Sequence, residues 1–487
     1  MVSSDSGVKA KSGLVLALLA FAQFIITIDY NIVYVALPDI GKELDFSTQS
    51  LQWVVSAYLL GFGGFLLLGG RAVDRFGQRR MFIAGLSLYG ISSLVGGLAT
   101  EPWMLVASRA VQGLGGALLT PAILALIMTS FAEGTERNKA LAVWGAAGSS
   151  GLAAGALLGG VLTEYLGWEA VFFVNVPLAL IAVLSAPRLL APDRTAPGEG
   201  AFDLPGGLLA TAGSSLLVFG LVSGPEKGWG SLSGAGSIVG GVVLLGVFLL
   251  VESRTRAPLV PLRLLRHRSL ATAMAVMFIF MGSLSGSYYL FTTYLQNVLG
   301  YDALQAGLAF LPLTVISMVG AGKLAPMALA KWGLRTTLAS GMFFIGVGQM
   351  VLALGYTSDG SFWALMPGTV IWGLAGYGFP AMYAAAGAGI APEEQGVASG
   401  LATTAQQVGG AVGLAAVVAI ANSGLDLVDG LPTADSLTDG LRIAGVAGGA
   451  ALVVAALIAL ALKKPDAAPE AQAAPTAGQR DTEVTEV

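Results

Sequence analysis

The stretch LVLALLAFAQFIITIDYNIVYVALP (Leu14–Pro38) decides how this chain must fold. It is long enough to cross the roughly 30 Å hydrocarbon core of a bilayer as a helix. Its one charged side chain is Asp29, which lies well inside the apolar run. A carboxylate at the centre of a transmembrane helix costs about 2.5–3.5 kcal/mol on insertion scales, and such residues are usually functional. The stretch therefore predicts a membrane-spanning helix and marks Asp29 as a candidate site residue.

The composition extends this interpretation to the whole chain. Of its 487 residues, 55% are hydrophobic and 11% are charged, whereas soluble proteins carry about 25% charged residues. The net charge of −4 does not indicate a nucleic-acid partner. The absence of cysteine excludes disulfides, thiolate metal sites and cysteine nucleophiles. The single histidine, His267, lies among arginines, so we expect neither a metal site nor a cofactor.

Apolar windows of about 20 residues recur along the chain and predict transmembrane helices, because a backbone in lipid must satisfy its own hydrogen bonds. The alternation typical of a transmembrane barrel is absent. The fold class predicted is an all-α integral membrane protein with fourteen spans, at residues 14–37, 51–70, 81–99, 104–128, 140–162, 171–190, 206–224, 236–252, 270–291, 304–325, 336–356, 362–387, 397–421 and 441–462.

The basic residues predict the orientation, since cytoplasmic loops are enriched in Lys and Arg. With both termini in the cytoplasm, 21 of the 25 basic residues lie on that side. Lys42, Lys227 and Arg442 lie on the external side of the membrane, and Arg109 lies within a span. We therefore expect a multi-pass protein of the cell membrane, with the lipid bilayer as its surroundings and no obligatory protein partner evident.

Two internal similarities predict a duplicated architecture. DRFGQR (Asp74–Arg79) is similar to AKWGLR (Ala330–Arg335), 256 residues later. The glycine-rich GALLGG (Gly155–Gly160) and GGAVG (Gly409–Gly413) are also eight spans apart. Duplicated halves around a central site are typical of transporters. We expect a six-helix half at 1–190, linkers with two inserted helices at 191–269, a second six-helix half at 270–463 and a disordered tail at 464–487.

Several motifs resemble the major facilitator superfamily, specifically its fourteen-helix drug:proton antiporter branch. GRAVDRFGQRR (Gly70–Arg80) resembles the signature between the second and third helices, and RAVQGLGGA (Arg109–Ala117) resembles the fourth-helix motif. IDYNIVYVALP, WEAVFFVNVP, YLQNVLGYDALQAGLAFLP and PEEQGVASGL are also similar to motifs of this branch. Ala156 stands where the antiporter motif of the fifth helix usually has proline. The resemblance implies a secondary active transporter that exports small molecules in exchange for protons, and no enzyme.

Asp29 and Arg109 are the residues that we expect to couple transport to protons. Counting 1.5 Å per residue from the predicted span ends places both in the outer half of the membrane, within about one helical turn of each other in depth. They are plausible partners, or members of one hydrated cavity. A carboxylate between burial and a nearby arginine can change its charge as its surroundings move. The alternative is a static ion pair that only fixes two helices together.

Charge limits the expected substrate. Asp29 is the only acid that we place deep within a span, and Arg109 offsets it. Neutral, zwitterionic or singly cationic amphiphiles are therefore favoured over dications. Candidate cavity residues are polar or aromatic side chains within the spans, several of which could equally be interfacial anchors or interhelical hydrogen bonders: Gln23, Gln52, Trp53, Tyr58, Gln296 and Gln406.

Two further groups of residues are candidates for conformational change. In the family resembled, the turn with Gly70, Asp74, Arg75, Gly77 and Arg79 clasps the neighbouring half, although an ordinary basic loop would look the same. Gly155, Gly159 and Gly160 predict close helix packing that would have to slide.

The favoured function is thus a proton-coupled exporter of small amphipathic drugs or antibiotics that works by alternating access. An exporter dedicated to one metabolite or self-made antibiotic fits the same residues. A membrane sensor or scaffold without transport fits less well, because it explains neither the duplicated halves nor the charged pair. No nucleotide-binding loop, metal cluster or nucleophile–base set is present in the sequence.

Overall fold

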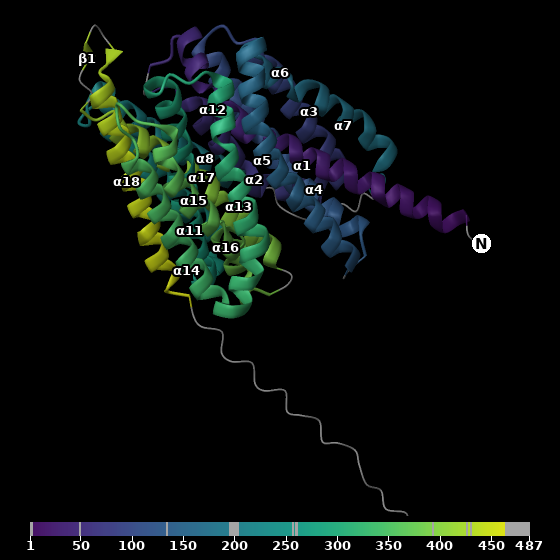
Figure 1. The fold of residues 1–487 in the computed structure, drawn as a ribbon. Coiled ribbons are helices and arrows are strands. Elements are labelled where there is room, and N and C mark those ends of the chain that lie inside the picture. The colour runs from purple at the N-terminus through teal and green to yellow at the C-terminus, as the bar shows by residue number, and fades with distance from the viewer. Residues whose placement is uncertain are drawn as a thin grey trace, which may run out of the picture.

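The computed structural model describes residues 3–47, 50–132, 135–193, 204–255, 258, 262–391, 394–424, 427–428 and 431–462. The predicted disordered tail, 464–487, and part of each predicted linker lie outside these residues. The described chain is almost entirely helical (Figure 1). The only strands in the described ranges, β1 (Leu427–Val428) and β2 (Leu431–Pro432), form a short antiparallel pair.

The helices of the first part of the chain are α1 (Ser3–Glu43), α2 (Trp53–Phe76), α3 (Gln78–Gly97), α4 (Pro102–Ser130), α5 (Thr135–Leu166), α6 (Ala170–Phe173) and α7 (Asn175–Leu189). Those of the middle are α8 (Leu204–Lys227), η1 (Leu232–Gly236), α9 (Ser237–Arg254) and α10 (Leu262–Leu265). Those of the last part are α11 (Arg268–Thr293), η2 (Tyr294–Val298), α12 (Ala303–Ala309), α13 (Leu311–Val319), η3 (Gly320–Leu324), α14 (Ala325–Leu354), α15 (Phe362–Leu374), η4 (Ala375–Tyr377), α16 (Gly378–Gly387), α17 (Gln395–Ala421) and α18 (Ala434–Ala459).

Length and apolarity make this an all-helical membrane protein. Within the described ranges, eleven helical segments are long and apolar enough to cross a membrane. Many large apolar side chains point outward, and α9 is the least buried of these segments, with Val239 60% exposed. Such surfaces are stable against hydrocarbon and not against water. The count of fourteen spans remains a prediction.

Some predicted boundaries were wrong. Helix α18 begins seven residues before the predicted start of the last span, because the hydroxyl of Thr433 caps it by accepting a hydrogen bond from the backbone N–H of Ser436. Arg442, predicted on the external side at the start of the last span, lies within α18 and pairs with Asp439 one turn earlier. In the predicted linker 253–269, residues 262–265 form the short helix α10.

Helices pack mainly within two sets, α1–α7 and α11–α18 (Figure 1). Helix α2 lies along α17, and α5 meets α12, so these two pairs join the sets. Helix α8 contacts α2, α17 and α9, and so covers the place where the sets meet. The division into two six-helix halves is consistent with this packing, and we return to it as a proposal below.

Glycine allows a close helix contact in the second set. A methyl group on Gly409 of α17 would overlap the carbonyl oxygen of Phe278 on α11. Without a side chain there, the two backbones touch directly. In lipid, where apolar side chains gain nothing by leaving solvent, such close van der Waals packing is a main source of helix association.

We expect Gly409→Ala to destabilise the protein even though alanine favours a helix by about 1 kcal/mol over glycine. The physical reason is the overlap with the Phe278 backbone, which only a shift of α11 can relieve. Gly396→Ala is the matched control on α17, because a methyl group there meets nothing within 4 Å. Thermal unfolding in detergent should show a lower midpoint for Gly409→Ala alone, and equal midpoints would contradict this account of the contact.

Candidate functional site

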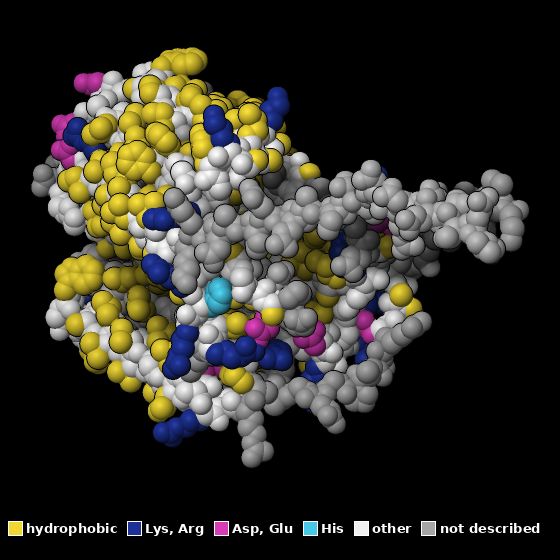
Figure 2. Space-filling view, turned by 90° about the horizontal axis from the view of Figure 1, so that it is seen from below, with side chains coloured by type: hydrophobic (Ala, Val, Ile, Leu, Met, Phe, Trp, Pro, Cys, Tyr) yellow, Lys and Arg dark blue, Asp and Glu magenta, His cyan; other side chains and the backbone are white. Residues whose placement is uncertain are grey.

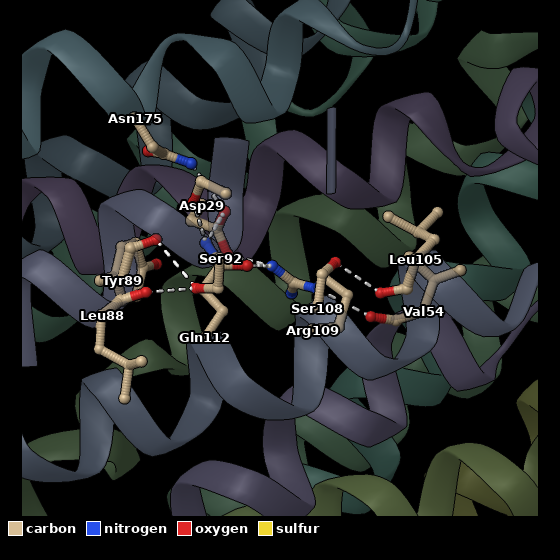
Figure 3. A network of polar contacts seen from close by, with 11 residues as sticks. Asp29, Val54, Leu88, Tyr89, Ser92, Leu105, Ser108, Arg109, Gln112 and Asn175 are labelled. Atoms are coloured by element: carbon tan, nitrogen blue, oxygen red, sulfur yellow. Dashed lines mark hydrogen bonds and ion pairs between the residues drawn. The ribbon is translucent and has the colours of Figure 1, made fainter. Parts of the chain in front are cut away.

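Asp29 lies at the centre of a buried polar network that joins five helices (Figure 3). Its side chain is fully buried, with 0% of its surface exposed. Arg109 Nη1 donates to Asp29 Oδ2 at 2.6 Å, so the two form a direct ion pair. Asp29 Oδ1 accepts from Gln112 Nε2 at 2.8 Å and from Asn175 Nδ2 at 2.9 Å. The carboxylate therefore accepts three hydrogen bonds from α4 and α7.

Arg109 is held as tightly as its partner. Its Nε donates to the carbonyl oxygen of Val54 on α2 at 2.9 Å, and its Nη1 also donates to Gln112 Oε1 at 2.6 Å. The guanidinium carbon lies 4.5 Å from the ring centroid of Tyr58, a cation–π contact. Ser93 on α3 completes the network by accepting from Gln112 Nε2 at 2.8 Å.

Local sequence explains this arrangement. Arg109 and Gln112 are three residues apart on α4, so they share one face of the helix. Close approach of α2 brings the Val54 carbonyl within reach, and Gly61 permits it because a methyl group there would overlap the carbonyl oxygen of Ala110. Asn175 is the first residue of α7, and Pro177 in the next turn has no N–H to continue the ladder from α6.

The energetics of this network depend on its completeness. Two charges withdrawn from water lose several kcal/mol of hydration each, and their attraction offsets this only when additional hydrogen bonds are made. Here the carboxylate has three donors and the guanidinium two further acceptors within 3 Å. The direct ion pair is the first of the two arrangements that were expected from the sequence.

The other predicted cavity residues do not gather around Asp29. Only Tyr58 reaches the network, through the ring contact with Arg109. Trp53 lines a mainly apolar groove of about 450 Å³ between α2, α4 and α8. Gln52 is buried just before α2, and Gln23 on α1 faces Gly148 of α5.

Gln296 and Gln406 lie at other contacts. Gln296 Nε2 donates to the carbonyl oxygen of Val35 at 2.9 Å and so links η2 to α1. Gln406 accepts from the hydroxyl of Tyr383 at 2.8 Å. Both residues belong to the second set of helices, Gln296 in η2 and Gln406 on α17. Gln296 bridges the two sets.

Sequence reasoning missed three members of the network. Gln112 and Asn175 stand within the quoted motifs RAVQGLGGA and WEAVFFVNVP, three residues after Arg109 and two before Pro177. Their presence in those motifs was the available signal. Ser93 gave no signal, because a serine in a glycine-rich apolar helix looks like ordinary packing.

Aromatic rings fill the region where α1 meets α11. Tyr34 contacts Tyr30 at 5.8 Å and Tyr288 at 5.6 Å between ring centroids. Tyr288 continues the cluster to Phe310 at 5.3 Å and Trp372 at 6.0 Å. The hydroxyl groups of Tyr30 and Ser285, 3.2 Å apart, form a hydrogen bond across the same contact.

The predicted gating turn is anchored to its own set of helices. Gly77 adopts φ = 101°, and Asp193, which follows α7, fills the space beside it. The carboxylate of Asp193 accepts from the backbone N–H groups of Arg79 and Arg80 at 2.9 and 3.0 Å, and so caps α3. Gly70, Asp74 and Arg75 lie in the last part of α2. Among the described residues, no hydrogen bond to Asp74 is found.

The predicted packing glycines of α5 face two different neighbours. Gly155 and Gly159 face the carbonyl oxygens of Ile28 and Ile32 on α1. Gly160 faces the second set, where a methyl group would lie 2.7 Å from the carbonyl oxygen of Ala303. Gly160 is thus the one of the three that touches α12.

A second buried polar contact lies in the second set of helices. Ser283 Oγ on α11 is 2.5 Å from Gln349 Oε1 on α14 and 3.0 Å from the carbonyl oxygen of Gly448. Ser283 follows Asp29 by 254 residues and Gln349 follows Ser93 by 256, close to the repeat spacing of the sequence. The corresponding positions of the second set are therefore neutral.

Two remaining features concern charge and metals. Glu252, 2% exposed at the end of α9, is a second buried carboxylate that the sequence interpretation overlooked. In the described residues, no group of three or more His, Cys, Asp or Glu side chains is placed to hold a metal ion.

Comparison with known proteins gives the family. A model described as the Major Facilitator Superfamily matches residues 19–414. The cephamycin export protein CmcT of Amycolatopsis lactamdurans is 39% identical over 85% of this chain and 86% of its own length. The puromycin resistance protein of Streptomyces alboniger is 40% identical over 82% and 80%, and the lincomycin resistance protein of Streptomyces lincolnensis is 34% identical over 96% of each chain.

The fold has a counterpart among solved structures. The crystal structure of the human organic anion transporter MFSD10 matches with a TM-score of 0.61, covering 93% of this chain and 99% of that one, at 14% sequence identity. That likeness concerns the fold. Together with the family match and the relatives above, it identifies the chain as a multi-pass membrane transporter of the Major Facilitator Superfamily.

Proposed function

We propose that this transporter exports small amphipathic drugs or antibiotics in exchange for protons, with Asp29 as the group that carries the proton. The names of the relatives support the export of antibiotics, since they describe export of cephamycin and resistance to puromycin and lincomycin. The ionisable pair at the centre of the α1–α7 set supports proton coupling.

The proposed architecture has fourteen crossings, in two six-helix halves with α8 and α9 inserted between them. Eleven segments qualify by length and apolarity. Three more crossings would come from α3, from the second part of the continuous run Ala303–Leu354, and from α15 with α16. That run is broken at Gly333, where φ = 72° and ψ = 170° interrupt the helix.

We place both chain termini in the cytoplasm. Figure 2 shows one end of the molecule, where Lys and Arg side chains gather around the single histidine, His267. Arg254, Arg263, Arg266 and Arg268 belong to the segments next to His267, and Arg263 pairs there with Glu394. A face so rich in basic residues is typical of the cytoplasmic side.

The main support for coupling is the burial of Asp29. A carboxylate with no exposed surface in a membrane helix is costly, and evolution retains it where it acts. An ion pair that served only to hold helices could be replaced by apolar residues of similar volume at little cost or with a gain in stability. Protonation of Asp29, by contrast, would free Arg109 and loosen a contact that five helices share.

Protons moving inward can supply the work of export. One pH unit corresponds to about 1.4 kcal/mol, and about 100 mV adds 2.3 kcal/mol per charge. Roughly 3–4 kcal/mol per proton supports an outward substrate gradient of a few hundredfold.

Asp29 has no exposed surface, so a proton exchanges with water only after helices move. Substrate entering from the cytoplasm or the inner leaflet displaces the proton, and Asp29 is protonated again when the site opens outward. The contacts of α2 with α17 and of α5 with α12 are the places where one half would move on the other.

The charges favour weakly charged substrates. Arg109 neutralises Asp29, and the corresponding contact of Ser283 and Gln349 carries no charge. A dication would enter this interior without a compensating acid. Neutral, zwitterionic or singly cationic amphiphiles, with apolar surface for the aromatic cluster of Tyr34 and Tyr288, are the substrates that fit.

An exporter dedicated to a single compound is the second candidate. It is favoured by the names of the three relatives, each of which refers to one antibiotic. A sensor or scaffold without transport has no comparable support, because the family and the relatives are transporters or resistance proteins.

The neutral variant Asp29→Asn should lose export driven by a pH gradient, because an amide cannot take up a proton at working pH. The measurement is efflux of a fluorescent amphiphile from proteoliposomes with an imposed pH gradient. Exchange of labelled for unlabelled substrate without a gradient should persist, which shows that the variant is folded. Asp439→Asn, which removes an exposed carboxylate, is the control. Unchanged gradient-driven efflux in Asp29→Asn would refute the proposed role.

Removal of one partner of the ion pair should destabilise the protein more than removal of both. Arg109→Met leaves a buried carboxylate without its counter-charge, which typically costs about 3–5 kcal/mol. The double variant Asp29→Asn/Arg109→Met has no buried charge, and we expect thermal unfolding near that of the native protein, without gradient-driven export. A double variant no more stable than Arg109→Met would contradict this account.

A panel of structurally unrelated antibiotics separates the two candidate functions. We expect a sensitive strain that expresses the protein to tolerate several amphipathic compounds of low charge, because the neutral interior of α11–α18 makes few directional demands on them. Minimum inhibitory concentrations measure this tolerance. Protection against one compound only would favour the dedicated exporter.

A further inference from the structure

The hydrogen bonds at Asp29 fit only one of its two protonation states. Arg109, Gln112 and Asn175 all present N–H groups to the carboxylate, at 2.6, 2.8 and 2.9 Å. An ionised carboxylate only accepts hydrogen bonds, so it suits this set of donors. A protonated carboxyl has an O–H that needs an acceptor, and it would meet a donor instead.

Few groups can become that acceptor. The guanidinium of Arg109 has only donors. Gln112 Oε1 already accepts from Arg109 Nη1 at 2.6 Å, and its Nε2 also donates to Ser93, so a reversal of this amide would break three contacts. Asn175 differs. Its Oδ1 is buried and makes no hydrogen bond with the described part of the chain.

We propose that Asn175 is a positioning residue that reverses its side-chain amide when Asp29 takes up a proton. With Asp29 ionised, Asn175 Nδ2 donates to Asp29 Oδ1, as observed. With a proton on Oδ1, the Asp29 O–H donates to Asn175 Oδ1. The nitrogen and oxygen of an amide occupy nearly the same positions, so a half-turn about the last side-chain torsion makes the exchange. The inference rests on the proposed role of Asp29 as proton carrier.

The exchange conserves the number of satisfied atoms. Before it, Asn175 Oδ1 has no partner, and after it, Nδ2 has none. One hydrogen bond between the two residues exists in both states, with its direction inverted. A buried group left without any partner costs about 1–3 kcal/mol, so an amide that serves both states keeps either from being strongly penalised.

Other titratable groups surround the same carboxylate and define the competing explanation. Arg109 on α4 is the charged one, and Tyr58 on α2 and Tyr89 on α3 contribute hydroxyl groups. Neither tyrosine makes a hydrogen bond to Asp29 in the described structure. Within the described residues, Asn175 is the only residue of α7 that forms a hydrogen bond with Asp29.

The position of Asn175 connects the surroundings of Asp29 to helix α7. It is the first residue of α7, beside the interruption that Pro177 produces. Helix α7 packs on α3 and α1, and its end carries Asp193, which caps α3. Asn175 thus lies on the helix that precedes Asp193, the residue that caps α3 beside Gly77.

Infrared difference spectroscopy between high and low pH tests the proposal in proteoliposomes. The native protein should show a carboxylic C=O band at low pH that disappears in Asp29→Asn. A side-chain amide band, assigned by isotopically labelled asparagine, should change with the same pH midpoint. In Asn175→Leu the amide change should be lost, and the carboxylic band should move to higher frequency, because its O–H no longer has an acceptor.

Matched variants separate this proposal from its rivals. Asn31→Leu removes a fully comparable amide that donates to the carbonyl oxygen of Leu152, and both bands should remain. A band that moves in Tyr58→Phe or Tyr89→Phe, and not in Asn175→Leu, would assign the acceptor to a tyrosine and overturn the proposal. An unshifted carboxylic band in Asn175→Leu would also overturn it, while loss of that band in Asp29→Asn would still support the proton carrier.

If Asn175→Leu does not fold, the labelled native protein decides alone, since labelling leaves the fold intact. An amide band that does not respond to pH would then refute the reversal. Absence of any carboxylic band attributable to Asp29 is a different result, because it would remove the proposed function itself.

Discussion

The ion pair of Asp29 and Arg109 determines which polar groups the helices of the first set, α1–α7, must bring together. Without water inside the membrane, each charge must find its hydrogen bonds among neighbouring helices. The result is a set of contacts from five helices. Helix α1 supplies the carboxylate, α4 the guanidinium and one amide, and α7 another amide. Helix α3 adds a hydroxyl group and α2 a carbonyl oxygen. The same completeness that makes the pair tolerable also makes it sensitive, because a single added proton leaves one donor facing another.

The second part of the chain repeats the arrangement without charge. Ser283 and Gln349 stand close to the repeat positions of Asp29 and Ser93, and the Ser283 hydroxyl lies within hydrogen-bond distance of Gln349 Oε1 and of the carbonyl oxygen of Gly448. Direct backbone contact at Gly409 joins α11 and α17 there. Close glycine contacts occur in both sets, and the first set adds a charged network where the polar contact of the second is neutral.

Much of this could be predicted from the sequence. Apolar length and charge placement predicted an all-helical membrane protein, and depth along two helices predicted that Asp29 and Arg109 could meet, as the ion pair confirms. The partners of Asp29 could not be derived, because an asparagine or serine in an apolar helix is equally compatible with packing. The scatter of Gln23, Gln296 and Gln406 has the same cause, since residue type does not give the direction in which a side chain points. The first turns of α18, before the predicted span, could not be derived because a polar first turn looks like a loop until its cap, Thr433, is seen.

The cap that Asp193 places on α3 has a consequence for how the gene can be divided. Asp193, which follows α7, binds the start of α3, so the α1–α7 set closes on itself at that edge. A polypeptide that stops just after Asp193 would keep both hydrogen bonds that cap α3. Two complementary fragments divided after Asp193 would therefore leave this cap in place.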